Sequence, residues 1–212
     1  MRLGLPWRSQ PPPASLLELE PPERYEQRSA ALERVASCLE QTPRCRVLDL
    51  GAPTASNLDF YNKKRATIAV ADFYRFFMDS RKTLQRASSR ARLLDELLPH
   101  DTDTHFDVVL AWDLLNYLSS DEIAWIMDGL SELCGHGAIM LALIRCRGEM
   151  PPSPSVYNIL DKDTLLYEAS GPSARPSPGY SEPTLTRMMP GVVVESRVQL
   201  RNKMVDYLFT YR

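Results

Sequence analysis

Three apolar runs in the middle of the chain each precede residues that could hold a ligand: Arg44–Leu50 before Gly51, Ala66–Ala71 before Asp72, and Phe106–Ala111 before Trp112 and Asp113. A glycine at the end of a strand removes the side-chain obstacle, so backbone N–H groups can face a bound molecule. A carboxylate such as Asp72 can accept two hydrogen bonds from a ribose diol. These residue types therefore predict a site for a small molecule with a nucleoside part.

The elements that must position these residues alternate between strand and helix. The three apolar runs, together with Ala138–Ile144, have the composition of short buried strands. A helix is expected over Glu23–Gln41, ending before Pro43. This alternation predicts an α/β fold, with a doubly wound, mostly parallel sheet and helices on both faces.

A second helix is predicted between the last two of these strands. Ser119 and Glu122 have capping-box spacing, apolar residues recur at helical spacing from Ile123 to Leu133, and Gly135 is expected to end the helix. Between sheet and helices we expect a core that includes Leu48, Val109, Ile126, Leu130, Ile139 and Leu141.

The C-terminal part of the chain breaks the parallel pattern. Val192–Leu200 and Met204–Arg212 are β-rich runs separated by only three residues. That connection is too short for a helical crossover, so the two runs should pair as an antiparallel hairpin.

Ligands bind outside the carboxyl ends of strands in such sheets, which places Trp112, Asp113, Asn116 and Tyr117 near the mouth of a crevice. Asp113 or Tyr117 is the expected base, should a reaction there need one. Structural alternatives remain open for three of the acidic and aromatic residues. Asp72 could cap the following helix, Asp113 could cap the next turn, and Tyr117 could pack with its hydroxyl at the surface.

Taken in order, these motifs resemble class I S-adenosylmethionine-dependent methyltransferases over roughly residues 40–212. RCRVLDLG resembles the family's first strand and cofactor loop, FDVVLAWDLLNYLSSDEI its fourth strand and the helix after it, and GHGAIMLAL its fifth strand. The resemblance implies an S-adenosylmethionine site formed by Asp49, Gly51, Ala52, Asp72, Phe73 and Trp112. It implies catalytic roles for Asp113 and Tyr117.

The cofactor loop departs from the family pattern after its first glycine. Pro53 and Ala55 stand where the second and third glycines are expected, and both narrow the approach to the methionine part of the cofactor. Neighbouring polar residues could compensate by hydrogen bonding or could simply cap the next helix; these are Thr54, Ser56 and Asn57.

The composition is that of an ordinary globular protein. The chain has 212 residues, 44% of them hydrophobic and 25% charged, with a formal net charge of −2. This excludes collagen-like and wholly disordered classes and gives no overall field to attract nucleic acid. No apolar run approaches the ~20 residues of a membrane span.

The 17 prolines predict the domain organisation. Residues 1–22 form a proline-rich N-terminal arm, and 23–212 a single methyltransferase-like domain. Within it, 151–190 is a proline-rich insertion or lid, with irregular connections around Val156–Ala169. The N-terminus lacks the apolar stretch of a secretory signal, so a cytoplasmic location is expected. The four cysteines show no metal-binding spacing and are expected to be free thiols, and no metal site is predicted.

Three functional hypotheses follow. The first is a methyltransferase that acts on a small molecule or a protein. The second is a catalytically silent domain of the same fold that serves as a protein-interaction or structural module. The third, a nicotinamide-dependent oxidoreductase, has little support because Gly-x-Gly-x-x-Gly is absent after Leu50.

Overall fold

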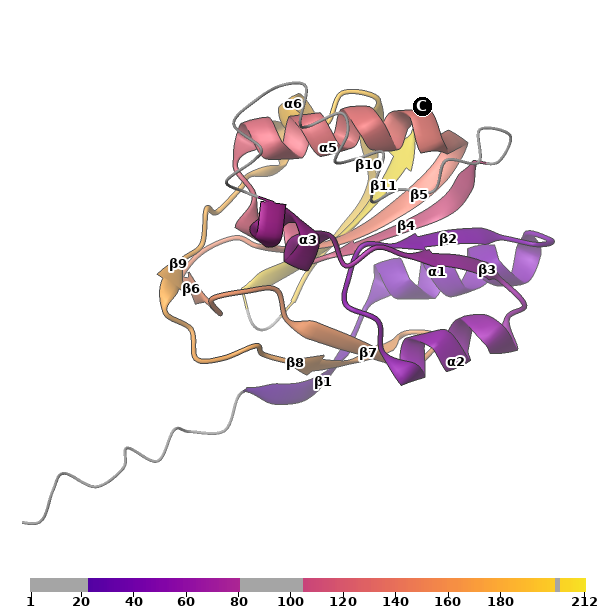
Figure 1. Cartoon of the computed structure of the whole chain (residues 1–212), viewed down its shortest axis with the longest axis horizontal. Coiled ribbons are helices and arrows are strands. Elements are labelled where there is room, and N and C mark those ends of the chain that lie inside the picture. Colours follow the sequence, from indigo (N-terminus) through magenta and orange to yellow (C-terminus); the bar gives the residue numbers. More distant parts are fainter. Residues whose placement is uncertain (1–22, 81–104, 201–202) are drawn as a thin grey trace, which may run out of the picture.

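A six-stranded sheet forms the centre of the molecule (Figure 1). The computed structural model describes residues 23–80, 105–200 and 203–212. The strand order is β10-β11-β5-β4-β2-β3, with bounds β2 (Arg46–Asp49), β3 (Thr67–Val70), β4 (Phe106–Trp112), β5 (Cys134–Arg145), β10 (Val192–Gln199) and β11 (Met204–Tyr211). Strands β3, β2, β4 and β5 run parallel to one another, whereas β11 is antiparallel to both β5 and β10. The predicted central strands and C-terminal hairpin are thereby confirmed.

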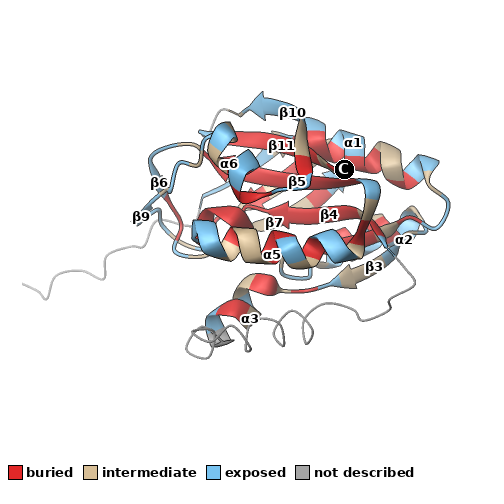
Figure 2. Ribbon diagram, turned by 90° about the horizontal axis from the view of Figure 1, so that it is seen from above, coloured by how far each residue is buried: buried red, intermediate tan, exposed pale blue. Residues whose placement is uncertain are grey.

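Helices cover both faces of this sheet, as predicted (Figures 1 and 2). On one face lie α1 (Ala30–Gln41) and α2 (Ala55–Lys63), which share a buried cluster with Val108 and Leu110 of β4. The cluster on the other face includes Val109 and Ala111 of the same strand. It packs against helices from three parts of the chain: α3 (Phe73–Ser80), α5 (Ser120–Leu133) and α6 (Glu182–Met188).

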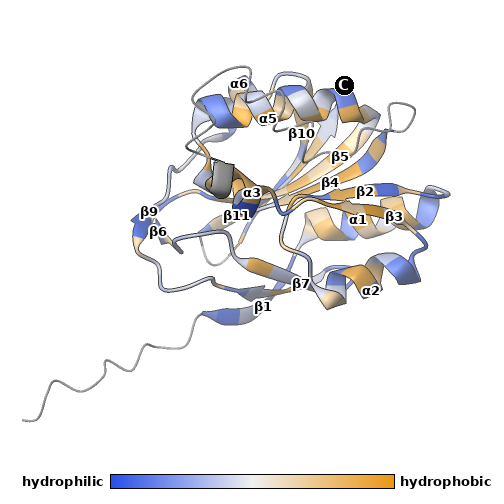
Figure 3. Ribbon diagram, viewed as in Figure 1, coloured by the Kyte–Doolittle hydropathy of each residue, from blue (hydrophilic) through white to orange (hydrophobic). Residues whose placement is uncertain are grey.

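The predicted core is confirmed. All six residues predicted to be buried are at most 2% exposed: Leu48, Val109, Ile126, Leu130, Ile139 and Leu141. Figure 3 shows the hydrophobic colouring concentrated on β4 and β5, as expected for strands covered on both faces. In the described parts of the chain, no helix is long and apolar enough to cross a membrane.

The start of α5 is as predicted, but its end is not. Ser119 and Glu122 form a reciprocal capping box at the N-terminus. At the other end, Cys134 already has extended backbone angles (φ −107°, ψ 131°), so the chain enters β5 directly after Leu133. Gly135 is therefore a strand residue, and the prediction that it ends the helix is wrong.

The predicted helix over Glu23–Gln41 is also wrong in its first turns. Residues Arg24–Arg28 form strand β1, with alternating exposure, and α1 begins only at Ala30. The cause is a tertiary contact, because β1 pairs with β8 (Thr164–Glu168) and the ring of Tyr25 stacks on that of Tyr167 at 4.8 Å. Pairing with a partner strand overrides the local helical pattern.

The apolar stretch Val156–Ala169, between the two connections expected to be irregular, forms a hairpin. Strand β7 (Val156–Asp161) pairs with β8, and β1 completes a three-stranded sheet in the order β1-β8-β7. Ile159, Leu165 and Tyr167 bury this sheet against the α1 face of the core. A two-stranded pair, β6 (Glu149–Met150) with β9 (Arg175–Pro176), lies at one end of the molecule.

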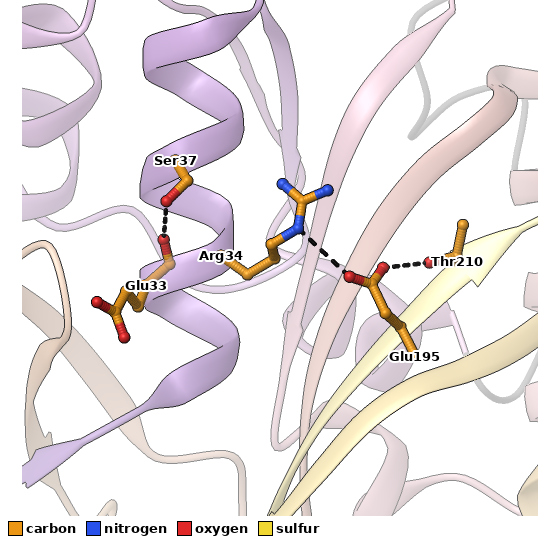
Figure 4. A network of polar contacts seen from close by, with 5 residues as sticks. All are labelled: Glu33, Arg34, Ser37, Glu195 and Thr210. Carbon is orange, nitrogen blue, oxygen red and sulfur yellow. Dashed lines mark hydrogen bonds and ion pairs between the residues drawn. The ribbon is translucent and has the colours of Figure 1, made fainter.

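The last two strands are tied to α1 by polar contacts on the surface (Figure 4). Arg34 Nε lies 3.3 Å from Glu195 Oε1, and the Thr210 hydroxyl donates to Glu195 Oε2 at 2.6 Å. One turn away, the Ser37 hydroxyl donates to the Glu33 carbonyl on the same helix at 2.9 Å. The ion pair is exposed, so its contribution to stability is small.

A matched pair of valine substitutions tests the assignment of the core. Val109→Ala should lower the free energy of unfolding by about 2–4 kcal/mol, because it opens a cavity beneath α5. Val198→Ala on β10 removes the same two methyl groups from a side chain that is 41% exposed, and should cost less than about 1 kcal/mol. Urea denaturation measures both, and equal costs would contradict the core assignment.

Candidate functional site

A cavity of about 320 Å³ lies at the carboxyl ends of β2, β3 and β4. This volume falls in the lower part of the range for small-molecule sites. Four chain segments form its walls; the residues are Leu50, Gly51, Ala52, Asp72, Tyr74, Arg75, Ala111, Trp112, Asp113, Leu114 and 153–157. The cavity therefore lies at the edge of the sheet where a parallel α/β fold binds its ligands.

Asp49, at the end of β2, is buried behind this cavity and fully bonded within the protein. Its Oδ1 accepts from Trp112 Nε1 at 2.6 Å and from the Gly51 N–H at 2.9 Å, while Oδ2 accepts from the Tyr61 hydroxyl at 3.0 Å. Burial raises the pKa of Asp49, and these hydrogen bonds oppose that rise. The carboxylate joins the ends of β2, α2 and β4.

The Trp112 indole covers Gly51. A Cβ built on Gly51 would lie 2.6 Å from Trp112 Cδ1, so this glycine makes room for the indole. The indole also stacks on the Tyr157 ring at 5.4 Å with an interplanar angle of 4°. Trp112 has a positive φ of 46°, which is a strained conformation for a bulky residue. The sequence predicts that a ligand lies against the Gly51 backbone. In the structure the Trp112 side chain occupies that space.

Asp72 caps the following helix, which is one of the two roles considered for it, and it also faces the cavity. Its Oδ1 accepts from the Arg75 N–H at 3.3 Å, so it caps α3. The same residue is part of the cavity wall. Phe73 is not, because its ring is 1% exposed and packs against Phe77 and Trp125 in the core.

Asp113 is the buried carboxylate of the cavity. It is 3% exposed, and its Oδ2 accepts from the Ser155 N–H at 3.1 Å. Its Oδ1 is also buried. Burial raises the pKa of Asp113 to about 7, against hydrogen bonding by Ser155 and Tyr157 that lowers it. Although Asp113 precedes the short helix η1 (Leu114–Tyr117), its side chain does not cap that turn.

The two other polar residues predicted near the crevice have different surroundings. Asn116 is structural: Nδ2 donates to the Asp113 and Leu143 carbonyls, and Oδ1 accepts from the Arg145 N–H. Tyr117 is 6% exposed, lies edge-on to Tyr74 and is not part of the cavity wall. Burial raises the pKa of its phenol above its ordinary value.

The loop residues that replace the expected glycines do not enclose the cavity. Pro53 and Ala55 are exposed, and neither is part of its wall. Thr54 caps α2 by accepting from the Asn57 N–H at 3.2 Å. The Asn57 side chain donates to the Tyr157 carbonyl and accepts from the Ile159 N–H, both within 2.9 Å. The polar loop residues therefore hold α2 and β7, and Trp112 is the side chain that covers Gly51.

Comparison with solved structures identifies the fold as that of class I S-adenosylmethionine-dependent methyltransferases. An S-adenosylmethionine-dependent methyltransferase from Clostridium acetobutylicum ATCC 824 aligns with a TM-score of 0.50 at 13% identity, covering 84% of this chain and 89% of that one. CalS10, an amino pentose methyltransferase from Micromonospora echinaspora, aligns with a TM-score of 0.46 at 14% identity, covering 85% and 90%. No protein-family model and no curated protein sequence matches the chain.

All four cysteines are free, with Cys45 and Cys134 buried and Cys38 and Cys146 partly exposed. Within residues 23–80, 105–200 and 203–212, no group of three or more His, Cys, Asp or Glu side chains could hold a metal ion.

The raised pKa of Asp113 predicts a pH dependence of stability. Its ordinary value is 3.8 and its folded value about 7. Between these values the folded state binds more protons than the unfolded state, so this group makes stability fall as pH rises. Between about pH 5 and about pH 8, wild type should lose about 2–3 kcal/mol relative to Asp113→Asn. Urea denaturation at both pH values measures the difference, and a parallel response of the two proteins would contradict the assignment; Asp128→Asn, on the exposed face of α5, is the control.

Proposed function

We propose that the cavity binds S-adenosylmethionine and that the protein transfers its methyl group to a small-molecule acceptor. The observation that carries the proposal is the position of the cavity at the ends of β2, β3 and β4, with Asp72 and the buried Asp113 in its walls. A solved structure with this fold is an S-adenosylmethionine-dependent methyltransferase, and the two carboxylates supply polar groups that such a site needs.

The residues fit the nucleoside part of this cofactor as they stand. Asp72 offers a carboxylate to a ribose diol, and Leu50, Ala111 and Leu114 give an apolar wall for a base. The methionine part would lie over Gly51, which the Trp112 indole covers, so binding would require this indole to turn away. A strained backbone at Trp112, worth about 1–3 kcal/mol, lowers the cost of leaving this conformation.

S-adenosylmethionine supplies an electrophilic methyl group on a sulfonium. The chain's part is to hold the acceptor in line and to receive a proton where the acceptor must lose one. Asp113 has the position and a pKa of about 7 for that task. Tyr117 is less suited, because its phenol lies outside the cavity wall and keeps its proton at neutral pH.

Calorimetric titration with S-adenosylhomocysteine tests the proposal. Wild type should bind, and Asp72→Asn should weaken binding by a factor of about 5–150 through loss of a charge-assisted hydrogen bond. Asparagine preserves the helix cap, so stability should change little. Asp128→Asn, on the exposed face of α5, removes the same charge away from the cavity and should bind as wild type does. Equal affinities of all three proteins would exclude Asp72 from the site.

A second candidate function is favoured by the contacts of Trp112. Its indole fills the space over Gly51 and donates to a carboxylate that already has two other partners. In this alternative the indole is a permanent part of the core, and the domain is a catalytically silent interaction or structural module.

Removing the indole distinguishes the two candidates. If the module hypothesis holds, wild type shows no binding of S-adenosylhomocysteine in the millimolar range, whereas Trp112→Ala gains it; Trp112→Leu provides a second, larger replacement. Pro53→Gly with Ala55→Gly is the matched control and should not restore binding, because both residues lie outside the cavity wall. Binding by wild type, accompanied by a change in tryptophan fluorescence, would instead support the methyltransferase.

A further inference from the structure

Two of the four cysteines, Cys38 and Cys45, lie side by side at the edge of the sheet opposite the cavity. Cys38 is in the last turn of α1, and Cys45 directly precedes β2. Cys45 belongs to the buried cluster on the α1 face of the sheet, and Cys38 packs against the same cluster. Cys134 begins β5 and Cys146 follows its end, and both contact the cluster on the other face. Within one chain, therefore, Cys38 and Cys45 are the two thiols that can meet.

The turn between α1 and β2 holds both cysteines through Thr42. The Thr42 N–H donates to the Cys38 carbonyl at 2.9 Å, and the Thr42 carbonyl accepts from the Cys45 N–H at 3.2 Å. The Thr42 hydroxyl oxygen lies 3.7 Å from Cys38 Sγ. The Cys45 carbonyl accepts from the Thr67 N–H at 2.9 Å, which ties it to the start of β3. The backbone on either side of the two thiols is thus fixed by hydrogen bonds.

The surroundings favour a thiolate on Cys38 and a protonated thiol on Cys45. A hydrogen bond with the Cys45 thiol lowers the pKa of Cys38 to about 6, against the opposing effect of burial. Thr42 and the Arg34 guanidinium, one helical turn earlier, lower it further, and Asp107 of β4 opposes them. The hydrogen bond with Cys38, burial and Asp107 all raise the pKa of Cys45.

The two sulfur atoms also differ in access. Cys38 is partly exposed, whereas Cys45 is 1% exposed. The thiolate is the reactive form of cysteine, so an oxidant from solvent meets Cys38 first. Cys45 is then in place to resolve an oxidised Cys38. An accessible thiolate beside a resolving thiol is the arrangement of redox-active cysteine pairs.

We infer that Cys38 and Cys45 form a dithiol site that reduces small hydroperoxides and closes to a disulfide. The Cys38 thiolate attacks one peroxide oxygen and the O–O bond breaks. Its electron pair leaves on hydroxide, or on alkoxide from an alkyl hydroperoxide, and Cys38 becomes a sulfenic acid. The Cys45 sulfur then attacks the Cys38 sulfur, the S–O bond breaks, and the oxygen leaves as water with the Cys45 proton. The two sulfurs lose two electrons in all, and the peroxide gains them.

This site is independent of the proposed methyltransferase function. It uses no residue of the cavity wall, and it lies at the start of β2, whereas the cavity lies at the carboxyl end of that strand. Its test therefore needs neither S-adenosylmethionine nor a methyl acceptor.

One equivalent of hydrogen peroxide, added to the reduced full chain, tests the inference. The chain has four thiols, and titration should find two of them lost, with a mass lower by two hydrogens. Trypsin separates the two cysteines into peptides 35–44 and 45–46, which the disulfide should hold together until dithiothreitol releases them. A chain that keeps all its thiols, or a disulfide between two chains in place of this one, overturns the inference.

Three variants assign the two roles. Cys38→Ser should keep its remaining thiols reduced under the same conditions. Cys45→Ser should stop at a sulfenic acid on Cys38, which dimedone traps; Cys45→Ala is the alternative should a buried hydroxyl impair folding. Cys146→Ser is the matched control, because Cys146 is also partly exposed but its thiol donates to the Lys203 carbonyl at 3.0 Å. It should form the disulfide as wild type does.

The rates of the two accessible cysteines give the size of the effect. In reduced wild type, peroxide should oxidise Cys38 at least about tenfold faster than Cys146, as followed by mass spectrometry of the alkylated peptides. Equal rates at the two positions, or a disulfide that still forms in Cys38→Ser, overturn the inference.

Discussion

The cavity depends on the buried carboxylate of Asp49. Through three hydrogen bonds it fixes the end of β2, the Tyr61 side chain of α2 and the Trp112 indole at the end of β4. Because each bond connects a different element, the spacing of the sheet edge and the position of the indole are set together. A charge at this depth is tolerated only because its oxygens are bonded. The same bonds that stabilise the edge also place Trp112 over Gly51.

Residues 153–157 close one side of the cavity. Hydrogen bonds from side chains hold this segment, which does not belong to the central sheet. Asn57 binds the backbone of β7 with both ends of its amide, and Asp113 accepts the N–H of Ser155 just before that strand. The three-stranded sheet then anchors β7 to the α1 face of the core. Asn57 and Asp113 thus hold the part of the cavity wall that residues 153–157 form.

The sequence predicted the sheet well because its strands are continuously apolar, as at Phe106–Ala111, and because a three-residue connection permits only a hairpin at the C-terminus. It failed at Arg24–Arg28, where Tyr25 satisfies a helical stripe as well as a strand paired with β8. The sequence placed Asp72 and Asp113 at one crevice because each follows the carboxyl end of a predicted parallel strand. The contacts of Trp112 did not, since a tryptophan that ends an apolar strand gives no sign of the glycine it will cover. Likewise, nothing in Val156–Ala169 announced that its hydroxyls would meet Asp113.

The two buried aspartates, Asp49 and Asp113, differ in their hydrogen-bond partners and in their position relative to the cavity. Asp49 and Asp113 are both at most 3% exposed, and burial raises the pKa of each. Asp49 has partners for both oxygens and belongs to the framework, whereas Asp113 accepts the Ser155 N–H and is part of the cavity wall. A buried carboxyl group keeps its proton to a higher pH than an exposed one, unless hydrogen bonds and charges offset the burial. At Asp113 they offset it only in part, which leaves a group with a pKa of about 7 at one end of the cavity.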